Sequence, residues 1–261
     1  MPLVETLRIT HIEFSSVKPE VPVREFDSAR EAARAAAQTI LTTVIHKPDA
    51  AIMFATGNTM EPVYEELVEL ANATNVDFSQ MQAFHLDEYN GVSPKDPESF
   101  VGFLRKRVFD PLHIPETHRH EMRGDTGNAN KEAERYNTEI NKQPMDLVIL
   151  GIGPGGHIAF NEPKTPFTTQ THVAPLSQET VTRDITRGQR TLTEALTVGI
   201  ANILNAKEII MVGYGEGKGI ELKKALHGPI TEACPASALQ QITDRVSVIC
   251  DRPAATILRS T

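Results

Sequence analysis

Short runs of consecutive apolar residues alternate along the chain with longer segments in which apolar residues recur every three or four positions. The first pattern is typical of strands buried on both faces, and the second is typical of amphipathic helices. We expect strands at 50–55, 81–86, 145–150, 208–212 and 246–250. We expect helices at 27–46, 61–73, 100–108, 130–142, 191–205 and 219–226. Strands that alternate with helices predict an α/β fold built around a parallel sheet.

The length of the chain sets the scale of this fold. With 261 residues and 40% hydrophobic content, it can bury a substantial core as one large α/β domain or as two small ones. We predict a single domain over residues 1–261, because this is the simpler arrangement. Residues 1–26 hold short β-like pieces interrupted by Pro19 and Pro22, so we expect an N-terminal arm or an edge strand there.

Charge and cysteine usage exclude several classes of function. A net charge of −8 argues against nucleic acid or an anionic membrane as a partner, since both require a basic surface. An anionic small molecule is compatible with this charge if a few cations line one cleft. Cys234 and Cys250 lie in apolar surroundings without metal-type spacing, which suits reduced thiols. No segment has the pattern of a secretory signal or a membrane span, so we expect a cytoplasmic protein.

The strongest candidate for chemistry is the segment LVILGIGPGGHIAFNEP, from Leu147 to Pro163, which runs from a buried strand into a glycine-rich turn. Ligands of parallel α/β sheets bind beyond the carboxyl ends of the strands. Glycines there let backbone N–H groups approach a ligand, while His157 and Glu162 are the parts of a proton-transfer site. The same letters fit the dinucleotide pattern G-x-G-x-x-G, but that pattern needs a helix at its third glycine. A glycine loop with a buried structural histidine is a third interpretation.

Two other strand ends could bind an anion. The strand at 50–55 leads into a small polar turn and then a helix, where backbone N–H groups and the helix dipole favour negative charge. The residues of this turn are Thr56, Gly57, Asn58 and Thr59. The strand at 208–212 leads into GYGEGKG, whose Lys218 would complement an anion held at the first turn. A plain turn with hydroxyl caps and an ordinary first-turn lysine are the alternative interpretations.

The strand at 81–86 ends in two acidic residues, Asp87 and Glu88. Successive residues of a strand point to opposite faces, so at most one of the two carboxyls can face a common pocket. The alternative is that both acids are simply solvated. Three histidines, His113, His118 and His120, lie in a proline-containing loop without metal-site spacing, and we predict that they are structural.

Five segments resemble those of glucosamine-6-phosphate deaminases (isomerases), and they occur in that family's order. They are HLDEY at 85–89, PES at 97–99, GHIAFNEP at 156–163, ALTVG at 195–199 and PASALQ at 235–240. The resemblance covers roughly residues 27 to 251, and GHIAFNEP is its most specific part. The related 6-phosphogluconolactonases share the fold and a Gly-His pair, but we expect them to lack FNEP. The resemblance implies an open, mostly parallel sheet of modified Rossmann type with helices on both faces.

The resemblance also implies an activity, the conversion of glucosamine 6-phosphate and water to fructose 6-phosphate and ammonia without metal or cofactor. Carried over by position, Asp87 would move a proton from C2 to C1, His157 would open the sugar ring, and Glu162 would orient His157. The phosphate-binding residues would be Thr56, Gly57, Asn58, Thr59 and Lys218, joined by Arg187 or Arg183. The implied partner is a small sugar phosphate, and the features above leave room for a homo-oligomer.

Two positions depart from the family pattern. Gly155 stands where an aspartate usually precedes the Gly-His pair, and Asn58 stands where a glycine is usual. The usual aspartate helps Glu162 to set the tautomer of the histidine. The alternatives are therefore an active deaminase with a simplified relay, an enzyme for the galactosamine epimer or a 6-phosphogluconolactonase-like hydrolase, and a sugar-phosphate binder with little turnover.

Overall fold

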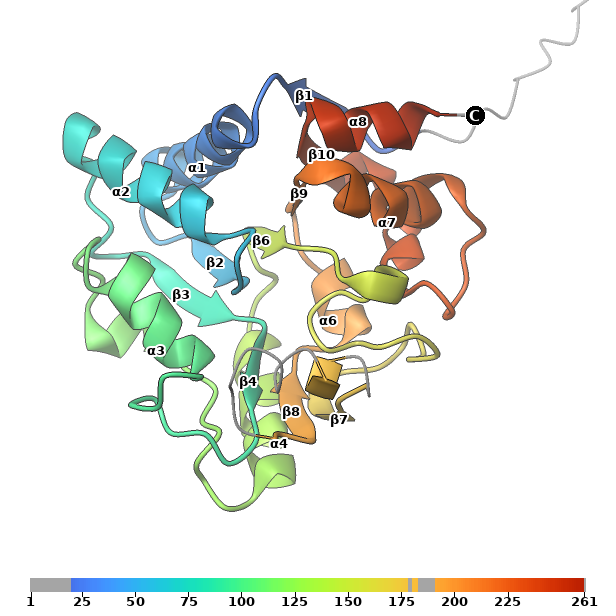
Figure 1. Ribbon diagram of the computed structural model, residues 1–261. Coiled ribbons are helices and arrows are strands. Elements are labelled where there is room, and N and C mark those ends of the chain that lie inside the picture. Colours follow the sequence, from blue (N-terminus) through green and yellow to red (C-terminus); the bar gives the residue numbers. More distant parts are fainter. Residues whose placement is uncertain (1–19, 178–179, 183–190, 261) are drawn as a thin grey trace, which may run out of the picture.

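The computed structural model describes residues 20–177, 180–182 and 191–260 (Figure 1). Its centre is a seven-stranded sheet with the order β1-β10-β9-β6-β2-β3-β5, in which every neighbouring pair is parallel. The strands are β1 (Val23–Phe26), β2 (Ala51–Phe54), β3 (Gln82–His85), β5 (Arg119–His120), β6 (Leu147–Leu150), β9 (Ile209–Gly213) and β10 (Val246–Asp251). The predicted α/β fold with a mostly parallel sheet is confirmed.

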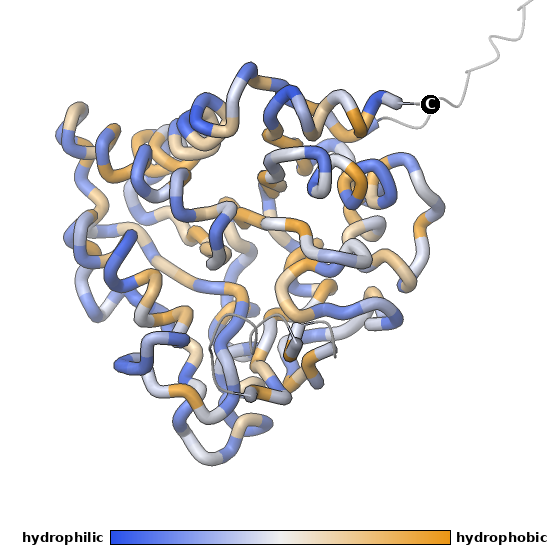
Figure 2. The backbone as a smooth tube through the Cα atoms, viewed as in Figure 1, coloured by the Kyte–Doolittle hydropathy of each residue, from blue (hydrophilic) through white to orange (hydrophobic). Residues whose placement is uncertain are grey.

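Helices pack around this sheet. They are α1 (Ala29–His46), α2 (Glu61–Thr74), α3 (Phe100–Leu104), α4 (Ala129–Ile140), α6 (Ile200–Leu204), α7 (Gly215–His227) and α8 (Arg252–Arg259). α1 packs against α2, and α7 packs against α8 (Figure 1). The apolar stripe predicted for residues 27–46 is buried, and α1 is capped by Ser28, whose side chain accepts a hydrogen bond from Glu31 N. All residues of β6 and β9 are buried, and both strands are hydrophobic in Figure 2.

A second, antiparallel sheet lies beside the first, with the order β4-β8-β7. Its strands are β4 (Asp87–Tyr89), β7 (His172–Pro175) and β8 (Glu194–Thr197). One residue, Leu86, separates β3 from β4. Its N–H donates to Phe54 O in the large sheet (3.1 Å), and its carbonyl accepts from Val198 N at the small sheet (2.8 Å). The chain therefore passes from one sheet to the other at Leu86, and Asp87 lies directly at this junction.

One predicted element is wrong, and one helix was not predicted. The sequence pattern predicts one helix over 191–205, but this segment forms β8, a two-residue connection and the short helix α6. A glycine is required at position 199 of this connection, because a Cβ there would lie 2.2 Å from Thr169 O and 2.3 Å from Gln170 O. The strand predicted at 246–250 is observed as β10, but the helix α8 that follows it was not predicted. Asp251 caps α8 by accepting from Ala254 N (3.0 Å).

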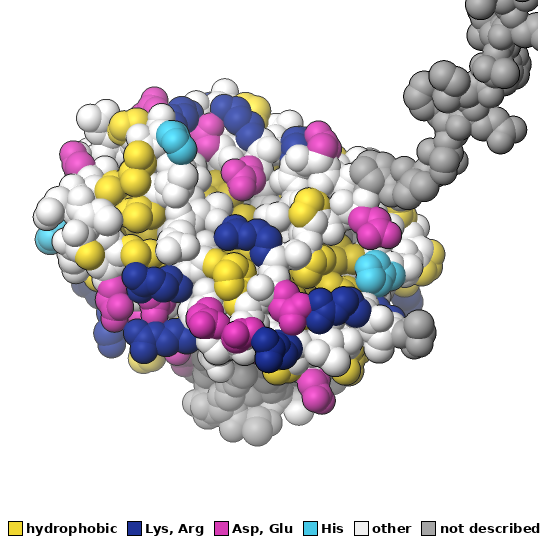
Figure 3. All heavy atoms as spheres, turned by 90° about the horizontal axis from the view of Figure 1, so that it is seen from above, with side chains coloured by type: hydrophobic (Ala, Val, Ile, Leu, Met, Phe, Trp, Pro, Cys, Tyr) yellow, Lys and Arg dark blue, Asp and Glu magenta, His cyan; other side chains and the backbone are white. Residues whose placement is uncertain are grey.

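The surface carries both signs of charge. Figure 3 shows acidic and basic side chains interspersed over one face of the molecule. Within the ranges that the structure describes, no helix combines the length and the apolar character needed to cross a bilayer.

Candidate active site

A cavity of about 490 Å³ lies at the carboxyl ends of β2, β6 and β9. From the central strand β6 the chain proceeds to β9 on one side, and from β2 it proceeds to β3 on the other side. Such a reversal leaves a crevice in which ligands of α/β sheets bind, and the volume suits a small molecule. The predicted site residues that line it are Thr56, Gly57, Asn58, Thr59, Asp87, His157 and Lys218. Glu162 lies behind His157, and Arg187 lies outside the described residues.

The turn after β2 has the geometry of an anion site. Gly57 has a φ of +96°, a conformation that glycine adopts without strain, and its carbonyl accepts from Met60 N (2.9 Å). α2 then begins at Glu61 with Met60 at its N-cap. Because methionine has no side-chain oxygen to cap the first turn, backbone N–H groups there can bind an anion together with the helix dipole.

Lys218 reaches the same cavity from the other side of β6. It belongs to the first turns of α7, which begins at Gly215, so the helix starts earlier than predicted. Its ammonium group donates to the carbonyl of Ile152, in the loop after β6. This contact holds the cation at the mouth of the glycine-rich loop, on the side that faces the turn at residues 56–59.

Asp87 and Glu88 lie in different surroundings, as the alternation of strand residues predicted. Asp87 lines the cavity but is only 8% exposed. Burial, and then the neighbouring charge of Glu88, raise the pKa of Asp87 to about 8. A carboxyl with such a pKa can exchange a proton near neutral pH, which is the property required of a general base or acid.

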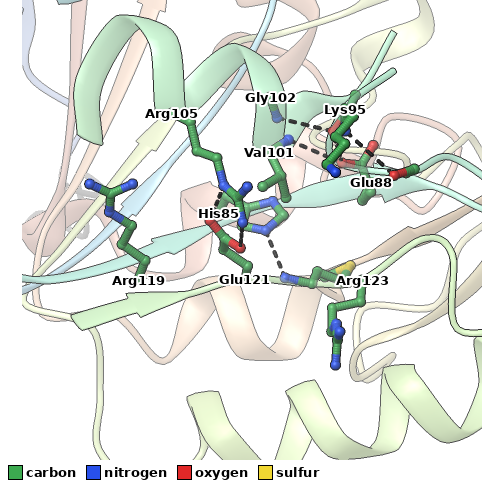
Figure 4. A network of polar contacts seen from close by, with 12 residues as sticks. His85, Glu88, Lys95, Val101, Gly102, Arg105, Arg119, Glu121 and Arg123 are labelled. Atoms are coloured by element: carbon green, nitrogen blue, oxygen red, sulfur yellow. Dashed lines mark hydrogen bonds and ion pairs between the residues drawn. The ribbon is translucent and has the colours of Figure 1, made fainter. Parts of the chain in front are cut away.

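Glu88 is fully buried on the opposite face of β4 (Figure 4). Its carboxylate accepts hydrogen bonds at the start of α3, from Ser99 Oγ (2.7 Å), Phe100 N (3.1 Å) and Val101 N (3.0 Å). Burial raises the pKa of Glu88 even though these bonds favour the charged form. The DEY and PES segments are therefore joined physically: Glu88 fixes α3 against β4, and α3 in turn forms one wall of the cavity.

Two glycines of the loop after β6, Gly153 and Gly156, are required by close packing. A Cβ on Gly153 would lie 1.8 Å from Nε2 of His157, so the imidazole packs directly on this backbone. Gly156 has a φ of +73°, and a Cβ there would lie 2.3 Å from Sγ of Cys234. The loop forms a single 3₁₀ turn at Pro154–Gly156 and then becomes extended at His157. The dinucleotide interpretation is wrong, because no helix follows the third glycine.

His157 is oriented by a carboxylate. Its Nδ1 lies 3.4 Å from Oε2 of Glu162, whose other oxygen accepts from Thr180 Oγ1 (3.3 Å). Burial opposes the ionised form of Glu162, but hydrogen bonds from His157, Ser177 and Thr180 hold the pKa of Glu162 below its ordinary value. A carboxylate at Nδ1 leaves Nε2, the nitrogen over Gly153, as the one that faces the cavity. The hydrogen bonds of Ser177 and Thr180 to Glu162 could not be predicted from the sequence.

Three aromatic rings form an apolar wall that the sequence analysis did not identify. Tyr89 and Phe100 lie 4.7 Å apart, and Tyr89 and Phe160 lie 5.5 Å apart, measured between ring centroids. All three line the cavity. Tyr89 belongs to the DEY motif, Phe100 follows PES and Phe160 belongs to FNEP. Their positions in these motifs could have predicted that they line the site.

One cavity thus brings together a turn with the geometry of an anion site, a lysine, a buried carboxyl and a histidine beside a carboxylate. Together they define a site for proton-transfer chemistry on a small anionic substrate, carried by an α/β fold. The model of the family described as glucosamine-6-phosphate isomerases/6-phosphogluconolactonase matches residues 24–248. The chain belongs to this family, so the resemblance of its motifs is confirmed.

Individual relatives point to one branch of the family. A glucosamine-6-phosphate deaminase of Streptococcus pneumoniae (strain 70585) is 41% identical over 207 residues, which are 78% of this chain and 85% of the relative. The solved structure of a monomeric glucosamine-6-phosphate deaminase is 34% identical, with a TM-score of 0.86 over 90% of this chain and 99% of that chain. A 6-phosphogluconolactonase from Trypanosoma cruzi shares the fold, with 19% identity and a TM-score of 0.74 over 92% of this chain and 98% of that chain.

Proposed function

We propose that this protein is a glucosamine-6-phosphate deaminase, an enzyme that converts an amino sugar phosphate and water to fructose 6-phosphate and ammonia. One observation carries the proposal: Asp87 and His157 face the same cavity as the anion-binding turn at residues 56–59 and Lys218. A hexose held by its phosphate at one end of this cavity can present its reacting carbons to both side chains. The names of the relatives that are 41% and 34% identical support the choice of substrate.

Ring opening is the first step, because the cyclic sugar has no carbonyl group to stabilise the charge that develops when C2 loses its proton. His157 takes the proton of the C1 hydroxyl and returns it to the ring oxygen, which breaks the C1–O5 bond. Glu162 keeps the proton on Nδ1, so that Nε2 is ready to accept this one. General acid-base catalysis of this kind contributes about 10²- to 10⁴-fold to the rate.

Proton transfer between carbons is the second step. Asp87 removes the proton from C2 of the open-chain sugar, which forms an enolamine, and returns the proton to C1, which forms the imine of fructose 6-phosphate. Water adds to the imine carbon and ammonia leaves, so one water is consumed for each ammonia released. Because Asp87 is buried, its carboxylate is a stronger base than an exposed one.

The phosphate supplies positioning energy, because it is remote from the reacting carbons. Gly57, Asn58 and the hydroxyls of Thr56 and Thr59 would bind it together with the first-turn N–H groups of α2. Lys218 would neutralise part of its charge, with Arg187 as a further cation.

Product analysis tests the proposal. We expect ammonia and fructose 6-phosphate in equal amounts from glucosamine 6-phosphate, little turnover of galactosamine 6-phosphate, and no hydrolysis of 6-phosphogluconolactone. Asp87→Asn is expected to abolish ammonia release. The variant should still bind inorganic phosphate with nearly unchanged affinity. Preferential turnover of the galactosamine epimer or of the lactone would replace the proposed substrate. A rise in melting temperature with the sugar phosphate, without turnover, would indicate a binding protein.

Three features stay predictions from the sequence: the single domain, the cytoplasmic location and homo-oligomer formation.

A further inference from the structure

His85 is a fully buried histidine that the mechanism above does not use. It ends β3, two residues before Asp87, on the other side of the junction at Leu86. Its Nδ1 lies 2.9 Å from the backbone carbonyl oxygen of Asp87, and its Nε2 lies 2.8 Å from the backbone nitrogen of Met122. Figure 4 shows the ring of His85 directed toward the chain between Glu121 and Arg123.

These two contacts select one protonation state of the imidazole. The backbone N–H of Met122 can only donate, so Nε2 of His85 must be the acceptor. The carbonyl of Asp87 can only accept, so Nδ1 must carry the proton and donate it. Burial lowers the pKa of His85 to about 4, which is consistent with a neutral ring throughout the physiological range.

The carbonyl of Asp87 needs such a donor because it lies on the unpaired side of β4. Pairs in an antiparallel ladder alternate between hydrogen-bonded and non-hydrogen-bonded. The carbonyl of Leu86 accepts from Val198 N at the β8 side, so the carbonyl of the next residue, Asp87, points the other way. β4 is an end strand of its sheet, so no strand of that sheet lies on that side of the described structure. A buried carbonyl without a donor is costly, and His85 supplies the donor.

The backbone of His85 is itself held in place. The hydroxyl of Tyr136, on α4, accepts from His85 N (2.9 Å) and donates to His85 O (2.8 Å). The imidazole is therefore attached to a fixed backbone and bridges two others, those of Asp87 and Met122. Such a bridge limits movement of the chain at the point where it passes between the two sheets.

We infer that His85 is a positioning residue for the proposed reaction: its neutral imidazole clamps the main chain of Asp87, so that the carboxyl stays aligned with C2 of the sugar. The inference rests on the proposed function, because it assigns Asp87 as the base. His85 does not line the cavity, so it acts on the reaction only through Asp87. A misplacement of a reacting group by about 1 Å can cost about 10²-fold in rate, and the clamp prevents a shift of this kind.

A matched pair of variants tests the clamp. Leucine and asparagine have nearly the same shape, and at position 85 both lose the acceptor for Met122 N. Only His85→Asn keeps an N–H group that can donate to the Asp87 carbonyl. We expect His85→Leu to lower kcat about 100-fold with KM for glucosamine 6-phosphate changed less than about threefold. We expect His85→Asn to recover most of kcat at a similar KM. Equal losses of kcat in the two variants, or an unchanged kcat in His85→Leu, would overturn the inference.

A second measurement covers the case in which the variants fold poorly. Long-range ¹H–¹⁵N correlation spectra of the wild-type protein are expected to show His85 protonated only at Nδ1 near neutral pH. A ring protonated at Nε2, or at both nitrogens, would contradict the clamp without any assay of activity. Wild-type protein that releases no ammonia would instead contradict the proposed function, and the spectra would still decide whether the Asp87 carbonyl is clamped.

Discussion

Asp87 and Glu88 are neighbours in β4, but Asp87 faces the cavity while Glu88 faces away from it and caps the start of α3. The two carboxyls are nevertheless coupled, because the charge of Glu88 contributes to the raised pKa of Asp87. One acid thus lines the cavity, and the other both supports the wall of the cavity and raises the pKa of its neighbour.

This coupling predicts how activity depends on pH. In the proposed reaction Asp87 must be ionised to accept the proton from C2, and its pKa of about 8 means that the free enzyme holds it mostly protonated at pH 7. We expect kcat/KM to rise about tenfold per pH unit below pH 8 and to level off above it. The ionisation of the substrate's own amine is measured separately and divided out. In Glu88→Gln, which removes the neighbouring charge, the midpoint of the rise in kcat/KM is expected at lower pH. An identical midpoint in both proteins would contradict the coupling.

The same pKa predicts that the ionised carboxyl of Asp87 destabilises the fold. The pKa of Asp87 rises from 3.8 to about 8 on folding, so between these values the folded state holds a proton that the unfolded state has released. The free energy of unfolding therefore falls as the pH rises from about 4 to 8. The side-chain amide introduced by Asp87→Asn cannot titrate. We expect the variant to melt about 3 °C or more above wild type at pH 8, with a difference that shrinks toward pH 4. A difference independent of pH would show that Asp87 does not titrate in this range.

The hydroxyl of Thr180 offers a test of how Glu162 is held. In Thr180→Val, which keeps the shape of the side chain, Glu162 Oε1 loses the donor that lies 3.3 Å away. We expect kcat to fall about fivefold, the factor that corresponds to about 1 kcal/mol for one hydrogen bond, while KM changes little. Thr256→Val is the matched control, because Thr256 is exposed on α8 and its hydroxyl donates to Arg252 O and to no other atom of the described residues. Equal activity of the Thr180→Val variant and its control would mean that Glu162 does not depend on Thr180.

The parts of the fold that could be predicted are those in which local pattern and burial agree. β6 and β9 could be predicted as strands because both consist of consecutive apolar residues, as expected where both faces of a sheet are covered. The strand Glu194–Thr197 could not be predicted, because its letters also fit a helix. Its conformation is decided by pairing with β4 and β7, which lie far away in the sequence. Non-local pairing of this kind leaves no periodic signal in a segment of four residues.

The site shows the same division. Asp87 and His157 line one cavity, and this could be predicted because both follow buried strands and the carboxyl ends of parallel strands meet at one edge. The contacts of His85 and Thr180 could not be predicted, because each joins the side chain to a single atom of another residue, a backbone carbonyl for His85 and a carboxylate oxygen for Thr180. Contacts of this kind depend on tertiary geometry, and nothing in the order of residues specifies them.

The variant Gly155→Asp tests whether the activity is limited because position 155 lacks the aspartate that is usual in the family. Its φ is +70°, a conformation that costs about 1–2 kcal/mol for a residue with a Cβ, and a Cβ there would lie 3.0 Å from Cγ of Pro163. Glu162 is already held by Ser177 and Thr180, so a second acid has little to add to the orientation of His157. We therefore expect Gly155→Asp to lower the melting temperature by about 2–6 °C and to leave kcat within about threefold of wild type. Gly155→Ala is the control for backbone strain, and it should lose similar stability. A gain in kcat of about tenfold or more in Gly155→Asp alone would mean that Glu162 and the hydroxyls around it do not orient His157 fully in the wild-type protein, and that a second acid is needed.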